Sequence, residues 1–471
     1  MISAHIKDIA DAITCEPFAL ESGRKMVTGL TWDSREVSKD SIFLAMPGER
    51  VDGNDFIRQA IVKGAGLVIA TRKPDAQLLS VAGEFSCPIL LVDDGQAALT
   101  ELATWWRKRL HAVVIGVTGS TGKTSSKDFL ASVLSNQFNT AATKGNHNNE
   151  IGVPATVLSA SLDTDALIVE MGMRGMGQIE KLCKMVRPTI GCITNIGVSH
   201  LELLGSQENI ARAKGELLEA LPASGLAVLN ADDEFTPFIR QNTGADERGL
   251  KVLTYGFAED ADVRATDVTF DDSACPCFTL HLASGWEGPV HLSMPGRHNV
   301  KNALLAAAVG AYLGMQGKAI VAGLEAAQGS GMRLEIVRTE DGITFVNDAY
   351  NANPDSMAAS LDTLAHMDCT ERRIAILGDM GELGPDSYNL HVEVGKLVPS
   401  SNVDMLICVG DLARGYAEGA EQAGMNAYDI IMFDTVEDAD YHLRDVLYTG
   451  DLVLVKASRF MGLERLIGGM A

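Results

Sequence analysis

The feature that most constrains this chain is a glycine-rich turn that directly follows a run of β-branched residues. Residues 112–117 read AVVIGV, and they lead into TGSTGKTSS at 118–126. A strand that enters such a turn and leaves it through a helix points successive backbone N–H groups, and the positive end of the helix dipole, at one place. That place suits a phosphate group. The chain is therefore predicted to bind a nucleotide within an α/β domain.

Two residues at the end of this turn carry the chemistry that a nucleoside triphosphate requires. Lys123 would neutralise the β- and γ-phosphates, and the Thr124 hydroxyl would hold Mg²⁺. The general P-loop pattern has a glycine five residues before Gly122, where this chain has Val117. The turn predicts ATP or GTP binding without specifying the reaction, and a turn without function is the less favoured alternative. The residues predicted to contact nucleotide here are Gly119, Ser120, Thr121, Gly122, Lys123, Thr124 and Ser125.

The charge of the chain argues against one large class of partners. The formal net charge is −23, whereas a protein that binds duplex nucleic acid needs a basic face that displaces counterions. No apolar stretch approaches the ~18 residues that suggest a membrane span, and the acidic, helically spaced start is unlike a signal peptide. Cysteines scattered in apolar surroundings indicate a reducing compartment. We therefore expect a cytoplasmic protein with neither a nucleic-acid partner nor membrane insertion.

The length of 471 residues suggests about three domains, and strand-like runs place them. Residues 1–108 mix short apolar runs with turn-rich stretches, which predicts a small α/β domain. Residues 109–331 hold the glycine-rich turn and two continuous apolar runs that are typical of strands buried on both faces. Residues 332–471 alternate strand-like runs with amphipathic stretches, which predicts a Rossmann-like, doubly wound parallel sheet.

A carboxylate and an imidazole follow the two apolar runs of the central segment. Glu170 ends ALIVEM (166–171), and His200 follows the run IGCITNI (190–196). Carboxyl ends of parallel strands face the ligand crevice, so both side chains are predicted on the edge that carries the glycine-rich turn. Together they are a credible Mg²⁺ pair, although Glu170 alone could cap a helix and a lone histidine is more often structural.

A lysine is predicted on the apolar side of the next helix. In SQENIARAKGELLEAL, Ser206 is a plausible N-cap, and Lys214 is spaced to share one face with Ile210, Leu217 and Leu221. One interpretation is snorkelling, in which the stem covers apolar surface and the amine reaches water. The other is a partly desolvated amine that reacts with CO₂ and becomes a carbamate ligand for a second Mg²⁺. The residue pattern alone favours snorkelling.

The central motifs, taken in order, resemble those of the Mur ligase family. The matching stretches are TGSTGKTSSKD, KGNHNNEIGVP with Asn146 and Asn149, NIGVSHLELLGS and IARAKGEL. The stretch GRHNVKNA at 296–303 resembles the family's adenine-contacting segment and supplies Asn299 and Asn302. The residues MRLE at 332–335 resemble its γ-phosphate arginine motif, with Arg333. The glycine pattern of the family also accounts for the missing glycine at position 117.

The flanking segments resemble the members of this family that add D-alanyl-D-alanine. The C-terminal stretches are DAYNANP at 348–354, LGDMGELG at 377–384 with His391 after it, and VKASR at 455–459. The N-terminal DSR and GERVDG resemble the part that holds a UDP moiety. Met332 and Ala349 depart from the common glycine and serine, and neither removes a side chain that the chemistry needs. The residues so assigned to substrate are Ser34, Arg35, Arg50, Asp52, Tyr350, Asn351, Lys456, Ser458 and Arg459.

The resemblance implies an ATP-dependent ligase of peptidoglycan precursor synthesis. It would join D-alanyl-D-alanine to UDP-N-acetylmuramoyl-tripeptide through an acyl phosphate, with ATP and Mg²⁺ as cofactors. The resemblance gives Lys214 its carbamate role, places Arg333 on the γ-phosphate and places Asp348 on the ribose. The catalytic residues would be Lys123, His200, Lys214 and Arg333. The Mg²⁺ ligands would be Thr124, Glu170, His200 and Lys214, and a monomer is expected.

Two other functions stay open at this stage. A folylpolyglutamate-synthase-like enzyme shares the ATPase core but lacks the N-terminal UDP-binding segment. A P-loop kinase or GTPase-like switch would transfer or release phosphate without an amine acceptor, and it leaves the third segment without a role. The Asp-Asn-Pro-Arg motif of the diaminopimelate-adding relatives is missing from the sequence, which argues against that member of the family.

Overall fold

The computed structural model describes residues 1–19, 25–48 and 51–469. The chain divides into two compact units. The first comprises residues 1–116, 138–172 and 179–190, and the second comprises residues 117–137, 173–178 and 191–471. This division does not test the three predicted segments, so their boundaries stay a prediction. Within the described ranges, no helix is both long and apolar enough to cross a membrane.

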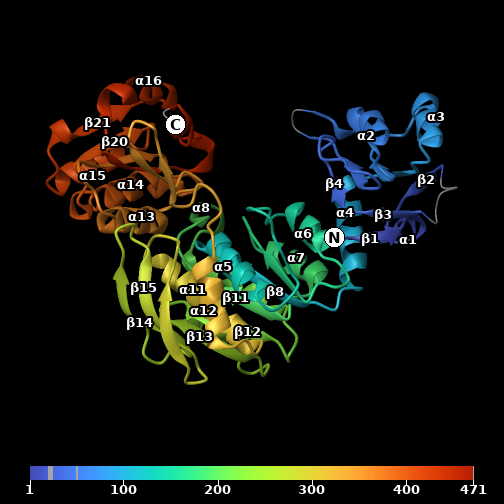
Figure 1. Cartoon of the computed structure of the whole chain (residues 1–471), viewed down its shortest axis with the longest axis horizontal. Helices are drawn as coiled ribbons and strands as arrows, with labels where there is room; N and C mark the ends of the chain where they lie inside the picture. The colour runs from blue at the N-terminus through green and yellow to red at the C-terminus, as the bar shows by residue number, and fades with distance from the viewer. Residues whose placement is uncertain (20–24, 49–50, 470–471) are drawn as a thin grey trace. The chain divides into compact units, whose positions relative to one another are not determined.

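The first unit begins with a small α/β fold around a five-stranded sheet (Figure 1). Its strand order is β2-β7-β6-β5-β4, in which the last four pair in parallel and β2 is antiparallel to β7. The strands are β2 (Glu16–Phe18), β4 (Leu30–Thr31), β5 (Ile42–Ala45), β6 (Leu67–Ala70) and β7 (Ile89–Leu91). A separate antiparallel pair joins β1 (Ser3–His5) to β3 (Met26–Thr28). The helices are α1 (Ile6–Ala10), α2 (Ile57–Lys63), α3 (Ala76–Glu84) and α4 (Gly95–Arg107).

The middle of the chain forms a nine-stranded sheet in the order β16-β15-β14-β13-β12-β11-β8-β10-β9. Its strands are β8 (Val113–Thr118), β9 (Thr140–Ala142), β10 (Ala166–Glu170), β11 (Ile190–Ile193), β12 (Leu226–Asn230), β13 (Lys251–Gly256), β14 (Val263–Phe270), β15 (Pro276–His281) and β16 (Glu287–His291). The strands β8, β10 and β11 confirm the apolar runs predicted from the sequence. The pairs β14–β15 and β15–β16 are antiparallel, and these strands were not predicted from the sequence.

Helices of the middle region lie between these strands or follow the last of them. They are α5 (Lys123–Ser135), α6 (Gly152–Ser159), α7 (Gln178–Val186), α8 (Leu201–Leu204), α9 (Gln207–Glu219), α10 (Thr236–Asn242), α11 (His298–Tyr312) and α12 (Gly317–Ala326). Ser206 caps α9 as predicted, because its hydroxyl accepts from the backbone N–H of Asn209 at 3.3 Å. The long helix α11 packs against α5, so the helix that follows the glycine-rich turn is covered by apolar residues.

The C-terminal part is a doubly wound sheet in the order β17-β18-β22-β19-β20-β21. Its strands are β17 (Glu335–Arg338), β18 (Thr344–Asn347), β19 (Arg373–Gly378), β20 (Met405–Val409), β21 (Ile430–Phe433) and β22 (Leu452–Lys456). Only β17 pairs antiparallel. The helices are α13 (Pro354–His366), α14 (Ser387–Gly395), α15 (Arg414–Gln422), α16 (Val436–Val446) and α17 (Arg465–Gly468).

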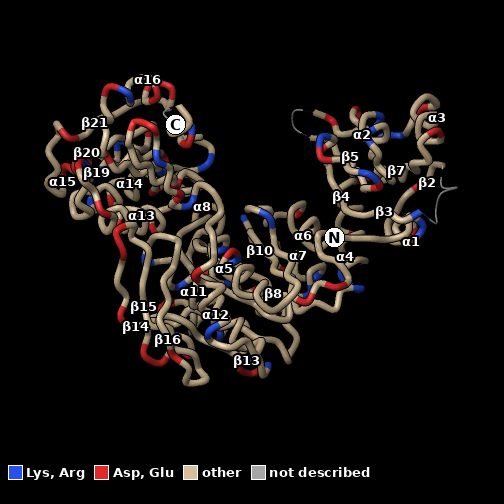
Figure 2. The backbone as a smooth tube through the Cα atoms, viewed as in Figure 1, with Lys and Arg blue, Asp and Glu red and all other residues tan. Residues whose placement is uncertain are grey.

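Alternate residues of these strands enter two separate cores, as the period of a strand requires. Leu406 and Cys408 of β20 pack with α13, α14 and α15, whereas Ile407 and Val409 pack with α16 and α17. Figure 1 shows α13 and α14 on one side of the strands and α16 on the other. The predicted Rossmann-like fold is therefore confirmed. In Figure 2, acidic segments occur in every part of the chain, so the net charge of −23 is not confined to one region.

Candidate active site

The glycine-rich turn joins β8 to α5, and two of its glycines have no room for a side chain. Gly119 has φ 151°, and a Cβ there would lie 1.8 Å from Thr194 Oγ1. Gly122, directly before α5, has φ 74°, and a Cβ there would lie 2.5 Å from Asn302 Oδ1. Both positions therefore require glycine, which gives a physical reason for the spacing in the sequence.

The segment that follows β11 holds this turn in place. The backbone N–H of Ser120 donates to the Asn195 carbonyl, and that of Thr121 donates to Asn195 Oδ1, each at 2.9 Å. The hydroxyl of Ser120 accepts from the Gly197 N–H at 2.8 Å. Lys123 Nζ curls over the turn and donates to the Gly119 carbonyl at 2.8 Å. The amine thus lies over the turn that is predicted to bind phosphate.

Arg333 lies against the end of this turn, and its predicted contact with the γ-phosphate stays a prediction. Its Nη2 donates to Thr124 Oγ1 at 3.0 Å. The guanidinium also lies 4.2 Å from the centroid of the Tyr350 ring. The flanking residues Met332 and Leu334 have φ of 58° and 54°, a left-handed backbone that favours glycine. This conformation is a physical reason for glycine to be common at position 332.

Glu170 carries a buried oxygen that has no protein partner. It ends β10, and the residue is 1% exposed. Its Oε1 accepts from Asn148 Nδ2 at 2.7 Å, whereas Oε2 is buried and forms no hydrogen bond with the described residues. An unpaired carboxylate oxygen in such a place is costly unless a cation or water satisfies it. Glu170 therefore fits the role of a metal ligand.

His200 precedes α8 and has a left-handed backbone, φ 64°. Its Nδ1 lies 2.6 Å from Glu382 Oε2. The pKa of His200 lies below its ordinary value: burial lowers it most, Glu382 raises it, and the charges of Lys214 and Lys123 lower it. His200 therefore shares one electrostatic environment with two of the lysines that were predicted to act beside it.

Lys214 is fully buried in α9, with 2% of its surface exposed. Its amine therefore does not reach water, and the snorkelling interpretation is wrong. Burial holds the pKa of Lys214 well below its ordinary value, and the nearby charge of Lys123 lowers it further. A lysine in this environment is readily neutral, which is the form that can react with CO₂.

Three of the asparagines that were predicted to contact nucleotide form hydrogen bonds within the protein. Asn302 Oδ1 accepts from Ser126 Oγ at 3.1 Å, and Asn302 Nδ2 donates to Asn299 Oδ1 at 2.9 Å. Asn149 Oδ1 accepts from the N–H of Gly152 at the start of α6. Asn146 is exposed. Their contacts to adenine or phosphate stay a prediction.

A pocket of about 460 Å³ opens beside the start of α11. It is lined by Phe257, Arg297, His298, Lys301, Ala358, Ala359 and Asp362. The guanidinium of Arg297 and the amine of Lys301 lie 5.1 and 5.5 Å from the centroid of the Phe257 ring. Arg297, His298 and Lys301 lie within the stretch at 296–303 that was predicted to contact adenine, although only Asn299 and Asn302 of that stretch were selected as site residues.

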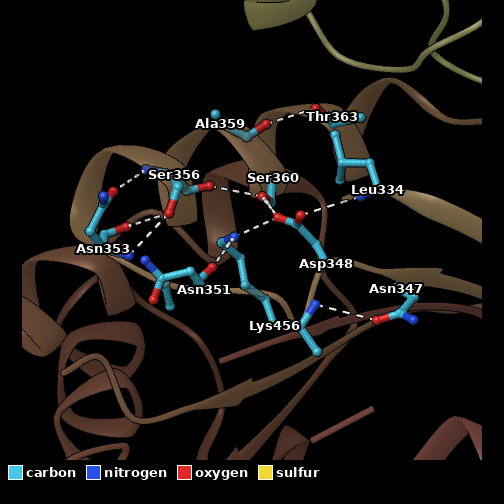
Figure 3. Close-up of polar contacts among 12 residues, drawn as sticks. Leu334, Asn347, Asp348, Asn351, Asn353, Ser356, Ala359, Ser360, Thr363 and Lys456 are labelled. Atoms are coloured by element: carbon cyan, nitrogen blue, oxygen red, sulfur yellow. Dashed lines mark hydrogen bonds and ion pairs between the residues drawn. The ribbon is translucent and has the colours of Figure 1, made fainter. Parts of the chain in front are cut away.

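Asp348 and Lys456 form a buried pair at the carboxyl ends of β18 and β22 (Figure 3). Lys456 Nζ lies 2.5 Å from Asp348 Oδ2 and donates to the Asn351 carbonyl at 3.0 Å. Asp348 also accepts from Ser360 Oγ at 2.6 Å and from the Leu334 N–H at 3.2 Å. Lys456 is 2% exposed and is therefore a buried lysine. The pair fixes the backbone that carries Tyr350 and Asn351.

The other predicted substrate residues are only partly explained by the structure. Ser458 Oγ accepts from the Gly381 N–H at 2.8 Å, and Arg459 Nη1 donates to Glu464 at 2.9 Å. Arg35 is largely exposed and pairs with Asp33, whereas Ser34 is buried. Asp52 caps a short 3₁₀ helix by accepting from the Asn54 N–H. Arg50 lies outside the described residues.

The described part of the chain holds no cluster of three or more histidine, cysteine, aspartate or glutamate side chains that could bind a metal. The predicted Mg²⁺ ligands include only two residues of these types, Glu170 and His200, so this finding does not decide the prediction. Glu382 is the residue that sequence reasoning missed. It belongs to the quoted stretch at 377–384, but nothing local in the sequence links that stretch to His200.

Three family models match the chain in order. The Mur ligase family, catalytic domain, matches residues 26–104; the Mur ligase middle domain matches residues 117–310; and the Mur ligase, glutamate ligase domain, matches residues 332–459. The UDP-N-acetylmuramoyl-tripeptide--D-alanyl-D-alanine ligase of Bacillus subtilis (strain 168) is 33% identical over 99% of this chain and 98% of that protein.

Two solved structures share the whole architecture. The crystal structure I of MurF from Acinetobacter baumannii superposes with a TM-score of 0.85, at 30% identity over 100% of this chain and 99% of that one. MurF ligase from Thermotoga maritima in complex with ADP gives a TM-score of 0.76, at 27% identity over 94% of this chain and 97% of that one. Both similarities extend from the N-terminal sheet to the C-terminal sheet.

Proposed function

This chain belongs to the Mur ligase family, and we propose that it is the ATP-dependent ligase that joins D-alanyl-D-alanine to UDP-N-acetylmuramoyl-tripeptide in peptidoglycan precursor synthesis. The observation that carries this proposal is the match along nearly the entire length to a relative with that name. A folylpolyglutamate-synthase-like enzyme or a P-loop switch does not account for the similarity of the N-terminal 104 residues.

The reaction needs an activated carboxyl group, because a carboxylate does not condense with an amine in water. The terminal carboxylate of the tripeptide takes the γ-phosphoryl group of ATP and becomes an acyl phosphate, and ADP leaves. The amine of D-alanyl-D-alanine then attacks the acyl carbon, phosphate leaves, and a proton is released. The first step brings two anions together, so the site has to neutralise negative charge.

The side chains around the glycine-rich turn are suited to this task. Lys123 and Arg333 supply two cations, and Arg333 already contacts the hydroxyl of Thr124. The pocket beside α11, with its volume of about 460 Å³ and its cationic wall, is where we place the adenosine part of ATP. Asp348 is held by Lys456 and Ser360 at the nearby end of the C-terminal sheet, where its contact to the ribose is proposed.

Mg²⁺ is part of this proposal, and the residues present fit it. The unpaired Oε2 of Glu170 favours a cation. Thr124, His200 and Lys214 would complete the ligands, with Lys214 as its carbamate, and the bound ion would neutralise phosphate oxygens. The buried amine of Lys214 supports the carbamate role. We further propose that the protein is cytoplasmic and monomeric and that its reaction partners are small molecules.

The test is phosphate release from ATP with UDP-N-acetylmuramoyl-tripeptide, with and without D-alanyl-D-alanine. We expect release that requires both compounds and that falls to background when single D-alanine or glutamate replaces the dipeptide. Release with neither compound, or only with a different amine, would overturn the substrate assignment while leaving the ATPase core intact.

A further inference from the structure

The loop that carries the stretch at 379–383 is fixed by an unusual set of hydrogen bonds. The backbone N–H of Met380 donates to His391 Nε2 at 2.9 Å, and the N–H of Gly381 donates to Ser458 Oγ at 2.8 Å. The N–H of Ser458 in turn donates to the Asp379 carbonyl at 3.0 Å. Two consecutive backbone donors are thus held by side chains from different elements, which leaves this loop little freedom.

His391 serves this loop in a defined tautomer. Its Nδ1 lies 2.7 Å from the Ser387 carbonyl, so it is Nδ1 that carries the proton and Nε2 that accepts from Met380. The side chain is fully buried against Tyr416, with ring centroids 4.8 Å apart. His391 and Ser458 were both part of the sequence motifs; Ser458 was assigned to substrate, and His391 had received no role in the chemistry. Their contacts show that they hold the loop.

The residue that this loop presents is Glu382. Its φ is 60°, a left-handed conformation that residues other than glycine rarely adopt. Strain of this kind persists where the surrounding structure imposes it, and it concentrates at functional sites. The conformation directs the carboxylate to His200 Nδ1, 2.6 Å away, whereas the nearest cation, Arg174, is at 3.9 Å. The histidine, and not the arginine, is therefore the main partner.

A histidine that ligates a metal commonly donates its other ring N–H to a carboxylate, which fixes the tautomer and the orientation of the ring. The neutral imidazole of His200 has one proton to place. If Nδ1 carries it and donates to Glu382, then Nε2 is the nitrogen with a free lone pair. Nδ1 of His200 is buried and has no aligned hydrogen bond with the described residues, and Glu382 Oε2, 2.6 Å away, is the carboxylate placed to take its proton; such a bond would leave Nε2 to ligate.

We propose that Glu382 is the positioning residue of His200: its carboxylate accepts the Nδ1–H and leaves Nε2 to ligate a divalent cation. This inference rests on the proposed role of His200 as a Mg²⁺ ligand. It assigns the motif at 377–384 a function, since the motif delivers a carboxylate from the C-terminal sheet to the metal site.

The first test reads the tautomer without metal, nucleotide or turnover. In protein labelled with ¹⁵N-histidine at about pH 8, where imidazoles are neutral, His200 is expected as the Nδ1–H form, assigned by loss of its signals in His200→Asn. Glu382→Ala is expected to move it toward the Nε2–H form, and Glu382→Gln, whose amide oxygen still accepts, is expected to preserve it. An Nε2–H form in the parent, or an unchanged tautomer in Glu382→Ala, would overturn the pairing.

The second test reads metal affinity with Mn²⁺ as the probe, by electron paramagnetic resonance in the presence of a non-hydrolysable ATP analogue. Loss of a carboxylate behind a ligating histidine typically weakens binding about 10–100-fold, and we expect about tenfold or more for Glu382→Ala and less for Glu382→Gln. Glu287, which lies 3.3 Å from His281 in the middle sheet, provides the matched control, and Glu287→Ala is expected to bind Mn²⁺ as the parent does. Unchanged affinity in Glu382→Ala would overturn the proposal.

These measurements separate the inference from the proposed function. Neither measurement involves the tripeptide or D-alanyl-D-alanine. If the parent protein showed no acceptor-dependent phosphate release, the substrate assignment would be wrong, and both measurements would still be valid. Unchanged Mn²⁺ affinity in His200→Asn would defeat the ligand role of His200, and with it the inference. Each variant is expected to unfold thermally at the same midpoint temperature as the parent, which would show that the fold is retained.

Discussion

Two lysines of this chain are buried to the same extent, and their surroundings differ in the one respect that determines their chemistry. Lys214 in α9 and Lys456 at the end of β22 are each 2% exposed. Lys456 forms an ion pair with Asp348 and a hydrogen bond with a backbone carbonyl. Among the described residues, no carboxylate forms an ion pair with Lys214, and the charge that acts on it is the cation of Lys123.

The difference teaches that burial alone does not define what a lysine does. A buried cation with a carboxylate partner is a structural element, because removal of either member leaves an uncompensated charge. A buried amine whose neighbour is another cation is pushed toward its neutral form, because burial and repulsion both oppose the charge. Lys456 should therefore matter for stability and Lys214 for reactivity, and each prediction below tests one side of this comparison.

The largest effect is expected on the stability side, from Lys456→Met. The substitution leaves the buried carboxylate of Asp348 without its cation, and we expect the free energy of unfolding to fall by about 3–5 kcal/mol. Urea unfolding followed by circular dichroism measures it. Lys318→Met, on the exposed side of α12, is the control that removes a lysine without a buried partner. A loss below about 1 kcal/mol, or full additivity in Lys456→Met with Asp348→Asn, would mean that the pair is not coupled.

The next effect is expected in activity, from Lys214→Ala. Loss of an electrostatic group of the site costs about 10²–10³ in rate, and we expect acceptor-dependent phosphate release to fall by that factor while the protein stays folded. A short carboxylate such as acetate should restore part of the rate if the amine acts as its carbamate. Lys318→Ala, tested under the same conditions, should retain full activity. Retained activity in Lys214→Ala, or the lack of any rescue, would contradict the carbamate role.

The sequence predicted the parts of this molecule that follow from local pattern. The strands of the three segments, the glycines at 119 and 122, and the cap at Ser206 each depend on residues that are close together in the chain. The antiparallel strands β14–β16 were missed although β15 alternates buried and half-buried residues as a strand does, because a register shift between Thr266 and Thr269 interrupts the period in β14 and β16 contains Gly288 and Pro289. Local periodicity is a sound guide where one period continues through a segment.

The pairs that matter chemically could not be predicted in the same way. Glu382 with His200, and Arg333 with Thr124, join residues that are far apart in the sequence, and no periodicity relates their positions. The exposure of a lysine is a similar case. Lys214 was predicted on an apolar face, yet only the structure determines whether its amine reaches water. Tertiary packing decides such contacts, so the family resemblance supplied the residues and the structure supplied their partners.

A smaller effect is expected from Ser360→Ala, which removes a hydrogen bond to Asp348 and keeps both charges of the Lys456–Asp348 pair. Ser360 Oγ donates to Asp348 at 2.6 Å, and hydrogen bonds to charged groups contribute about 1.5 kcal/mol or somewhat more. The free energy of unfolding should fall by about that amount. Ser400→Ala, whose hydroxyl donates to a backbone carbonyl in an exposed position, is the control. If Ser360→Ala equals Lys456→Met in cost, the ion pair contributes nothing beyond the hydrogen bond.

The last effect concerns pH and belongs to the Lys214 side. The folded chain holds this amine at a lowered pKa, whereas the unfolded chain binds a proton below about pH 10.4. The unfolded state therefore binds more protons over the window from the folded pKa up to about 10.4, and stability gains from this group as pH rises through it. Because of this group, the free energy of unfolding rises by at most about 1.4 kcal/mol per pH unit. Lys214→Met has no buried amine to neutralise, so we expect it to be more stable than the parent at pH 7. This difference in the free energy of unfolding should shrink toward pH 9 in CO₂-free buffer, because only the parent gains stability as the pH rises. Urea unfolding at pH 7, 8 and 9 measures the two profiles, with Lys318→Met expected to run parallel to the parent. If Lys214→Met ran parallel as well, the amine would already be charged in the fold, and the contrast between the two lysines would disappear.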